Sequence, residues 1–183
     1  MSTRCNIIIK SGESKVFMYR HCDGYLAETG ADIVRKLESA WGTDGAHYTP
    51  AGAADRFLRS LFSEYYDQQS YEKTPRRVYE LTTGLHGDIE HSYTIDFKNG
   101  FSTGSVSIRH AARPDTWHKE NMETDDWAWK GKRHTIDSLR DAVNQARKES
   151  NDRLARLRKD NGAYKDCEDY PMLQAPATQA IAA

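Results

Sequence analysis

Four side chains able to carry acid–base or metal chemistry lie on or beside predicted strands: His21, Asp23, His91 and His110. Because side chains alternate between the two faces of a strand, each histidine shares its face with apolar or aromatic neighbours. If the three faces coincide, three imidazoles meet on the covered side of one sheet, with the carboxylate at its edge. Such a group can hold a divalent metal, or move protons near pH 7.

A second interpretation of the same histidines is structural. Each can be a half-buried strand residue whose ring nitrogen bonds a backbone carbonyl, because separate strands do not have to bring their side chains within metal-ligand reach. The sequence also lacks the glycine loop of a P-loop and a serine-histidine-aspartate elbow. We therefore expect no cofactor and no metal. One alternative is a small metal- or histidine-dependent hydrolase or nucleotide-processing enzyme that works through these four residues. Another is a nucleotide-binding sponge, which would bind its ligand in a pocket beside the same residues without turnover.

Residues 113–133 form a second candidate region, in which tryptophans alternate with acidic side chains. We expect an irregular insertion that binds a protein partner, because exposed tryptophan buries a large area at little entropic cost. The alternative is that the tryptophans seat the insertion on the core and the acids are simply solvated. Acidic neighbours repel phosphates, so direct nucleic-acid binding is disfavoured. The candidate contact residues are Trp117, Glu120, Glu123, Asp125, Asp126, Trp127 and Trp129.

Length and composition limit the class of protein. The 183 residues, 38% of them hydrophobic and 29% charged, are enough for one domain with a buried core, and the net charge of −1 favours neither nucleic acid nor an acidic membrane as partner. The three cysteines form no CxxC pair. No apolar run approaches the roughly 20 residues of a membrane span, and the first residues lack an apolar leader, so we expect a cytoplasmic protein without a membrane partner.

Hydrophobic periodicity predicts an α+β domain over residues 1–162. Strands are expected at 5–9, 15–21, 77–85, 89–97 and 105–111, joined largely by hairpins into an antiparallel sheet of about five strands. Helices are expected over 33–41 and over 50–65, the latter capped by Thr49, and they should pack on one face of the sheet. We expect residues 163–183, rich in proline and alanine, to form a mobile tail.

A long C-terminal helix is predicted from about Ile136 to Lys159, with Thr135 as its N-cap. Its apolar stripe is interrupted by the polar stretch QARKESNDR. The first half should therefore dock on the domain, while the second half projects or pairs with another chain. A homodimer through this helix is one arrangement that the pattern allows.

The N-terminal stretch STRCNIIIK at 2–10, followed by a turn and by YRHCDGYL at 19–26, resembles small uncharacterised proteins of phages, prophages and some other genomes. The matching residues are Thr3, Arg4, Tyr19, Asp23, Gly24 and Tyr25. Two positions depart from that pattern, since Cys22 replaces an aromatic residue and Leu26 replaces a proline. The resemblance covers about a quarter of the chain and carries no known activity.

What the resemblance implies is a genetic context, because accessory genes of mobile elements often encode proteins that disable a host defence component or sequester a signalling nucleotide. From it we expect a binding protein rather than an enzyme. Its partner would be a host protein complex of the bacterial cytoplasm, inhibited in the manner of an anti-CRISPR protein. The tryptophan-rich insertion and the long helix would then be its contact surfaces.

Overall fold

The computed structural model describes residues 3–41, 49–64, 77–98, 106–114, 126–161 and 164–175. In chain order its elements are β1 (Cys5–Ser11), β2 (Ser14–Arg20), the π-helical turn η1 (Leu26–Gly30), α1 (Ala31–Trp41), α2 (Pro50–Phe62), β3 (Glu80–Thr82), β4 (His91–Phe97), β5 (Val106–Ala112), α3 (Asp126–Trp129), β6 (Lys132–His134) and α4 (Ile136–Asn161). None of the helices in these ranges is long and apolar enough to cross a bilayer.

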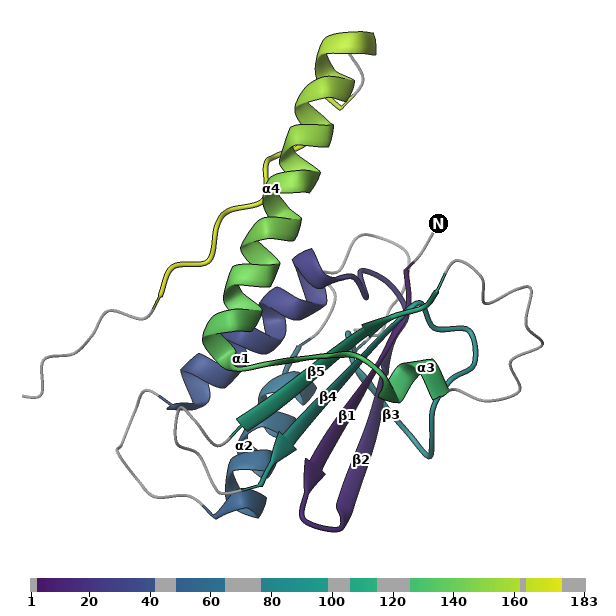
Figure 1. Ribbon diagram of the computed structural model, residues 1–183, viewed down its shortest axis with the longest axis vertical. Helices are drawn as coiled ribbons and strands as arrows, with labels where there is room; N and C mark the ends of the chain where they lie inside the picture. Colours follow the sequence, from purple (N-terminus) through teal and green to yellow (C-terminus); the bar gives the residue numbers. More distant parts are fainter. Residues whose placement is uncertain are drawn as a thin grey trace, which may run out of the picture.

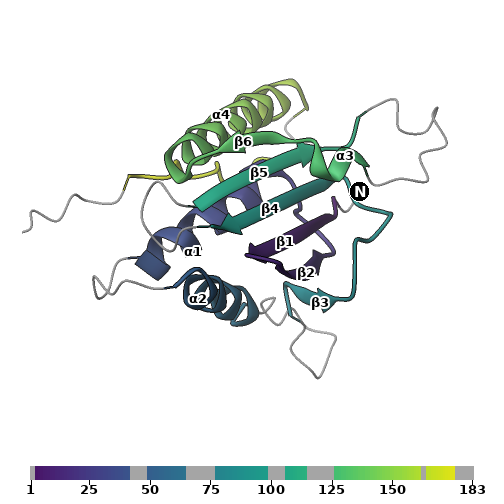
Figure 2. The same cartoon turned by 60° about the horizontal axis from the view of Figure 1, so that its bottom comes forward.

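The sheet has six strands in the order β3-β2-β1-β4-β5-β6 (Figures 1 and 2). The predicted α+β class and the long C-terminal helix are confirmed, but the expectation of about five antiparallel strands is wrong in two respects. First, β1 and β4 are parallel. The chain passes through α1, α2 and β3 before it returns to β1, which is the long connection that a parallel pair requires. Second, β6 begins inside the segment 113–133, which was predicted to be irregular.

The main core lies between one face of the sheet and the helices α1, α2 and α4, as Figure 2 shows. Alternate residues of β1 and β4 point to this side, and we call it the helix face. The predicted caps are confirmed: the amide of Gly52 donates to Thr49 Oγ1, and the amide of Ser138 donates to Thr135 Oγ1, each over 3.2 Å. The sheet residues of this core include Ile7, Ile9, Tyr93, Ile95 and Ile108.

The opposite face of the sheet, which we call the open face, is covered at one end by the short helix α3. Trp127 of α3 packs there with Tyr19 and Ala111 in a smaller apolar cluster. Because Tyr19 follows Met18 and Ala111 follows His110, both of which are on the helix face, these two residues point away from it. The two faces of the sheet therefore have different chemistry, and the site is best described one face at a time.

The junction at Asp23 and Gly24 is a tight backbone crossing. Asp23 adopts a left-handed conformation with φ 58°. The Gly24 amide donates to the Thr3 carbonyl over 2.9 Å, and a Cβ at this glycine would lie 2.6 Å from the carbonyl carbon of Arg4. Tyr93 donates its hydroxyl to the Gly24 carbonyl over 3.0 Å. These contacts give the junction a structural role that needs no ligand.

Beyond the sheet, α4 projects as an arm, and residues 164–175 run beside it in Figure 1. The segment is held there by side chains of α4, among them Asn144, Asn151 and Arg158. The sequence, which led us to expect a mobile tail from residue 163, does not predict these contacts.

Candidate functional site

Two of the predicted histidines meet. His91 Nδ1 lies 3.0 Å from His110 Nε2, on the helix face of the sheet where β4 and β5 pair. The His110 ring also stacks on Tyr93, with ring centres 4.8 Å apart. Strand alternation therefore places these two side chains correctly relative to each other.

The geometry of this pair is that of a hydrogen bond. The ring centres are 5.3 Å apart and the ring planes differ by 11°. With the nitrogens 3.0 Å apart, the two rings lie nearly end to end, so the N–H of one ring points at the lone pair of the other. Two lone pairs that converged on a metal would instead both point at a third position. The pair is built to share one proton.

Burial keeps both imidazoles neutral at pH 7. It lowers the pKa of His91 to about 4. It lowers the pKa of His110 to about 3, with further contributions from neighbouring His91 and His134. In each case the main cause is the cost of taking a charged ring out of water.

The other two residues of the predicted group lie elsewhere. His21 follows the open-face residue Tyr19, contacts its ring edge-on and lies with Nε2 3.3 Å from Oε2 of Glu80. Asp23 lies 3.9 Å from the guanidinium of Arg20. The three histidine faces therefore do not coincide, and the described residues contain no group of three or more metal-ligating side chains.

The tryptophan-rich region is only partly described. Trp127 is 6% exposed and belongs to the apolar cluster under α3, which favours the interpretation that it seats the segment on the sheet. Trp129 is half-buried, with the ammonium of Lys15 5.7 Å from its ring centre. Asp126 begins α3, but its side chain lies outside the described residues, as do Trp117, Glu120, Glu123 and Asp125.

The open face holds a polar hollow that the sequence analysis did not identify. It has a volume of about 170 Å³ and is lined by Lys10, Thr94, Asp96, Lys98, Ser107, Arg109, Trp129 and Arg133. We call it the cationic hollow, because four of these side chains are basic and one is acidic. The strands β1, β4, β5 and β6 form its floor, and Trp129 at the end of α3 forms a wall.

Strand register explains why these residues meet. Thr94 is opposite Arg109, and Arg109 is in turn opposite Arg133, so the three form one row across the sheet. Lys10 is opposite Asp96 in the neighbouring row. Four of these residues alternate with residues of the helix face, and the fifth, Arg133, pairs with Arg109, so all five point to the open face.

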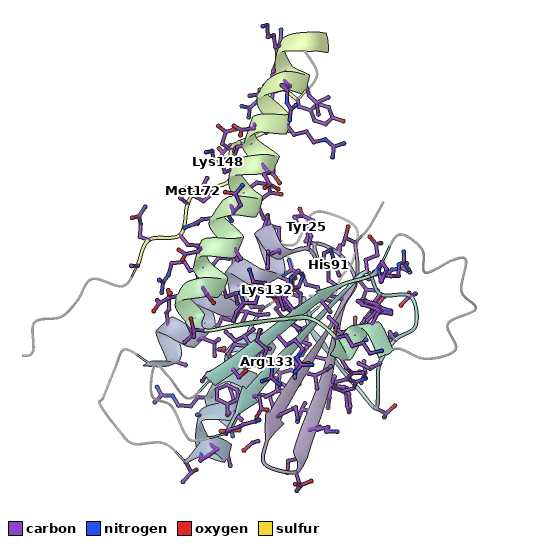
Figure 3. All side chains as sticks on the ribbon, in the orientation of Figure 1. Tyr25, His91, Lys132, Arg133, Lys148 and Met172 are labelled. Carbon is purple, nitrogen blue, oxygen red and sulfur yellow. The ribbon has the colours of Figure 1, made fainter. Side chains whose placement is uncertain are left out.

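Charge in the hollow is unevenly compensated. Asp96 Oδ2 lies 3.8 Å from the Lys10 ammonium and 3.7 Å from that of Lys98, so the one carboxylate is shared between two lysines. Arg109 donates to the backbone carbonyl of Trp129. Arg133, labelled in Figure 3, is exposed and has no ion pair with any described residue. The arginine side of the hollow is therefore the part that can accept an anion.

Thr94 contributes a hydroxyl group that is buried and unpaired among the described residues. Its side chain is 9% exposed and lines the hollow, and its hydroxyl has no hydrogen-bond partner within the described ranges. Leaving a buried hydroxyl unpaired costs free energy, so such groups are uncommon. A ligand oxygen in the hollow would satisfy it.

No protein-family model, curated protein or solved structure matches this chain.

Proposed function

We propose that the protein binds a phosphate-bearing small molecule, of the nucleotide class, in the cationic hollow. The observation that carries this proposal is the direct opposition, on neighbouring strands, of Arg109 and Arg133, neither of which forms an ion pair with a described carboxylate. The one carboxylate of the hollow is shared by its two lysines. Like charges placed directly opposite each other in a sheet are unfavourable. An anion bound between them converts this repulsion into attraction.

The chemistry of the lining favours phosphate over other anions. Guanidinium groups present paired donors that match two phosphate oxygens, and such charge-assisted bonds are stronger than neutral ones. The Thr94 hydroxyl can donate a further bond from the floor. Trp129 provides an aromatic surface on which a base can stack, a contact that tolerates any base.

Binding without turnover is the simpler role for this site. Arg109 and Thr94 point to the open face, while His91 and His110 point to the helix face. A ligand in the hollow is therefore separated from the histidine pair by the sheet itself. The proposal therefore keeps the alternative of a nucleotide-binding sponge but places its site in the cationic hollow instead of at the histidines. Inhibition of a host defence complex stays a prediction from the family resemblance.

The test is a titration of the full chain, followed by ¹H–¹⁵N NMR and calorimetry, with inorganic phosphate, pyrophosphate, AMP and a cyclic dinucleotide. We expect a nucleotide to bind with micromolar affinity and to shift the Trp129 indole resonance. Replacement of both arginines (Arg109→Gln, Arg133→Gln) should weaken binding by about a hundredfold or more, because each of the two lost charge-assisted bonds contributes about 1.5 kcal/mol or more.

The matched control removes two charges from α4 (Lys148→Gln, Arg153→Gln) and should leave the affinity unchanged. Equal weakening in the control, or no binding by any of the four compounds at millimolar concentration, would refute the proposal. Mass spectrometry of the recovered ligand distinguishes binding from turnover, since a hydrolysed nucleotide would support the enzyme alternative instead.

A further inference from the structure

The segment beside α4 is held through its backbone by two asparagines. Asn151 Nδ2 donates to the Tyr170 carbonyl over 3.0 Å, and the Tyr170 amide donates to Asn151 Oδ1 over 2.8 Å. In the same way, Asn144 Nδ2 donates to the Leu173 carbonyl over 3.0 Å, and the Leu173 amide donates to Asn144 Oδ1 over 2.7 Å. Each carboxamide therefore satisfies both the donor and the acceptor of one peptide residue.

The spacing of these pairs matches an extended peptide to a helix. Asn144 and Asn151 are seven positions apart, which is about 10.5 Å along an α-helix. Tyr170 and Leu173 are three positions apart, which is about 10 Å in extended backbone. The two asparagines thus form a ladder, by which we mean two carboxamides spaced to bond the backbone of an extended chain. Because they bond only backbone groups, this spacing does not depend on the side chains of that chain.

Side-chain contacts add selectivity to the ladder. The Tyr170 hydroxyl lies 2.8 Å from the hydroxyl of Tyr25, and the Arg147 guanidinium lies 5.6 Å from the Tyr170 ring centre. Arg147 also donates to the Pro171 carbonyl and, over 2.8 Å, to that of Ala27. Leu173 packs against the main core. The resident segment thus contributes an aromatic side chain and, three positions later, an aliphatic one to these contacts.

We infer that α4 and η1 form a binding groove for an extended peptide of the type Tyr-x-x-Leu, and that residues 170–173 occupy it as a built-in competitor. The chemistry is that of a peptide-recognition site, in which main-chain bonds give affinity and side-chain contacts at fixed spacing give specificity. Arg147 is also bonded to the Ala27 carbonyl of η1, a contact that does not involve the resident segment, so this side chain is held in the groove before a peptide binds. The partner that it fits is a protein segment with the same spacing of tyrosine and leucine.

Covalent attachment gives the resident segment a large advantage. A tethered ligand competes at an effective concentration in the millimolar range. An external peptide of equal intrinsic affinity therefore binds the unmodified chain weakly, and binds strongly only where the resident segment is weakened. This difference is what an experiment can measure.

The test uses the full chain with Tyr170→Ala and Leu173→Ala, which removes both anchors of the resident segment. A fluorescein-labelled peptide of residues 168–175 is added, and binding is followed by fluorescence anisotropy. We expect the variant to bind this peptide at least tenfold more tightly than the unmodified chain does. A peptide that carries the same two alanines should not bind.

Further substitution in the variant chain tests the ladder. Adding Asn144→Ala and Asn151→Ala should reduce binding at least tenfold, while adding Gln145→Ala on the exposed side of α4 should change it less than twofold. Equal affinity of the variant and the unmodified chain, or binding that ignores the asparagines, would overturn the inference.

Hydrogen exchange on the unmodified chain covers the case in which the variant does not fold. The amides of Tyr170 and Leu173 donate to the asparagines, so we expect both to exchange at least tenfold more slowly than the same amides in the free peptide. Exchange at the rate of the free peptide would contradict the groove directly.

Discussion

Arg109 on β5 and Arg133 on β6 lie directly opposite each other across an antiparallel strand pair, both on the open face of the sheet. Without an anion between them, this opposition works against the strand pairing that holds β6 in place. The paired arginines therefore lower the stability of the free protein and raise its affinity for a negative ligand, a combination that is common in binding sites.

The first prediction concerns this trade. Replacing Arg133 by Thr, a residue that suits an exposed strand, should raise the free energy of unfolding of the ligand-free protein by about 0.5 kcal/mol, because the like-charge pair is removed. Urea denaturation at low salt measures the change. The same variant should lose the additional stabilisation that a saturating nucleotide gives to the unmodified chain. A variant that is less stable than the unmodified chain would show that Arg133 supports the fold.

A second prediction tests how β6 is seated. Gly131 precedes β6, and a Cβ at this position would lie 2.1 Å from the carbonyl oxygen of His110. Gly131→Ala must therefore push the chain away from β5, at a cost of about 1–3 kcal/mol. It should also weaken ligand binding, since it displaces Arg133. Gly87→Ala is the matched control, because nothing lies within 4 Å of its added Cβ. Similar urea midpoints for the two variants would contradict this account.

The third prediction separates the roles of the two tryptophans of α3. Trp127 is buried under α3, so Trp127→Ala should destabilise the protein by about 3 kcal/mol. Trp129 lines the hollow and carries less buried contact, so Trp129→Ala should cost about 1 kcal/mol and mainly reduce nucleotide affinity. Thermal unfolding and calorimetry of both variants measure these effects. Equal destabilisation, with no loss of affinity for Trp129→Ala, would remove Trp129 from the site.

Strand alternation predicted which side chains share a face of one strand, but it did not predict how the faces of separate strands combine. Tyr93 and His110 are opposite each other in the register, so the pairing of β4 with β5 brings together His91 and His110, two of the three imidazoles in the hypothesis. His21 belongs to the β1–β2 hairpin, whose register from Ser11 to Ser14 puts it on the other side. That register depends on the turn, which short-range alternation does not specify.

The cationic hollow could have been found only by following the polar positions of the strands. Lys10 and Arg109 occupy the polar positions of strands in which polar and apolar residues alternate. Such polar residues usually face solvent, so their position alone does not indicate a binding site. Arg133 lies in a strand of three polar residues, which carries no alternation to detect. The pairing of Asn144 with Leu173 joins residues 29 positions apart through backbone atoms, and therefore leaves no pattern in the side-chain sequence.

The last prediction concerns pH and the pair formed by His91 and His110. An imidazole that is kept neutral by burial binds fewer protons in the folded chain than in the unfolded chain, over the range between its lowered pKa and 6.5. Folding stability should therefore be complete above pH 6.5 and fall as the pH drops toward 4. Each histidine contributes a loss of about 1 kcal/mol per pH unit in that window.

His110→Gln tests this dependence, because the amide keeps a hydrogen bond to His91 but does not titrate. We expect the variant to lose roughly half of the pair's contribution to the decline in stability between pH 6.5 and 4.5, as measured by urea unfolding at intervals of half a pH unit. Carboxylates contribute to the decline in both proteins, so the difference between the two curves isolates the histidine. Parallel curves over this range would mean that the ring of His110 titrates in the folded chain as it does in the unfolded one.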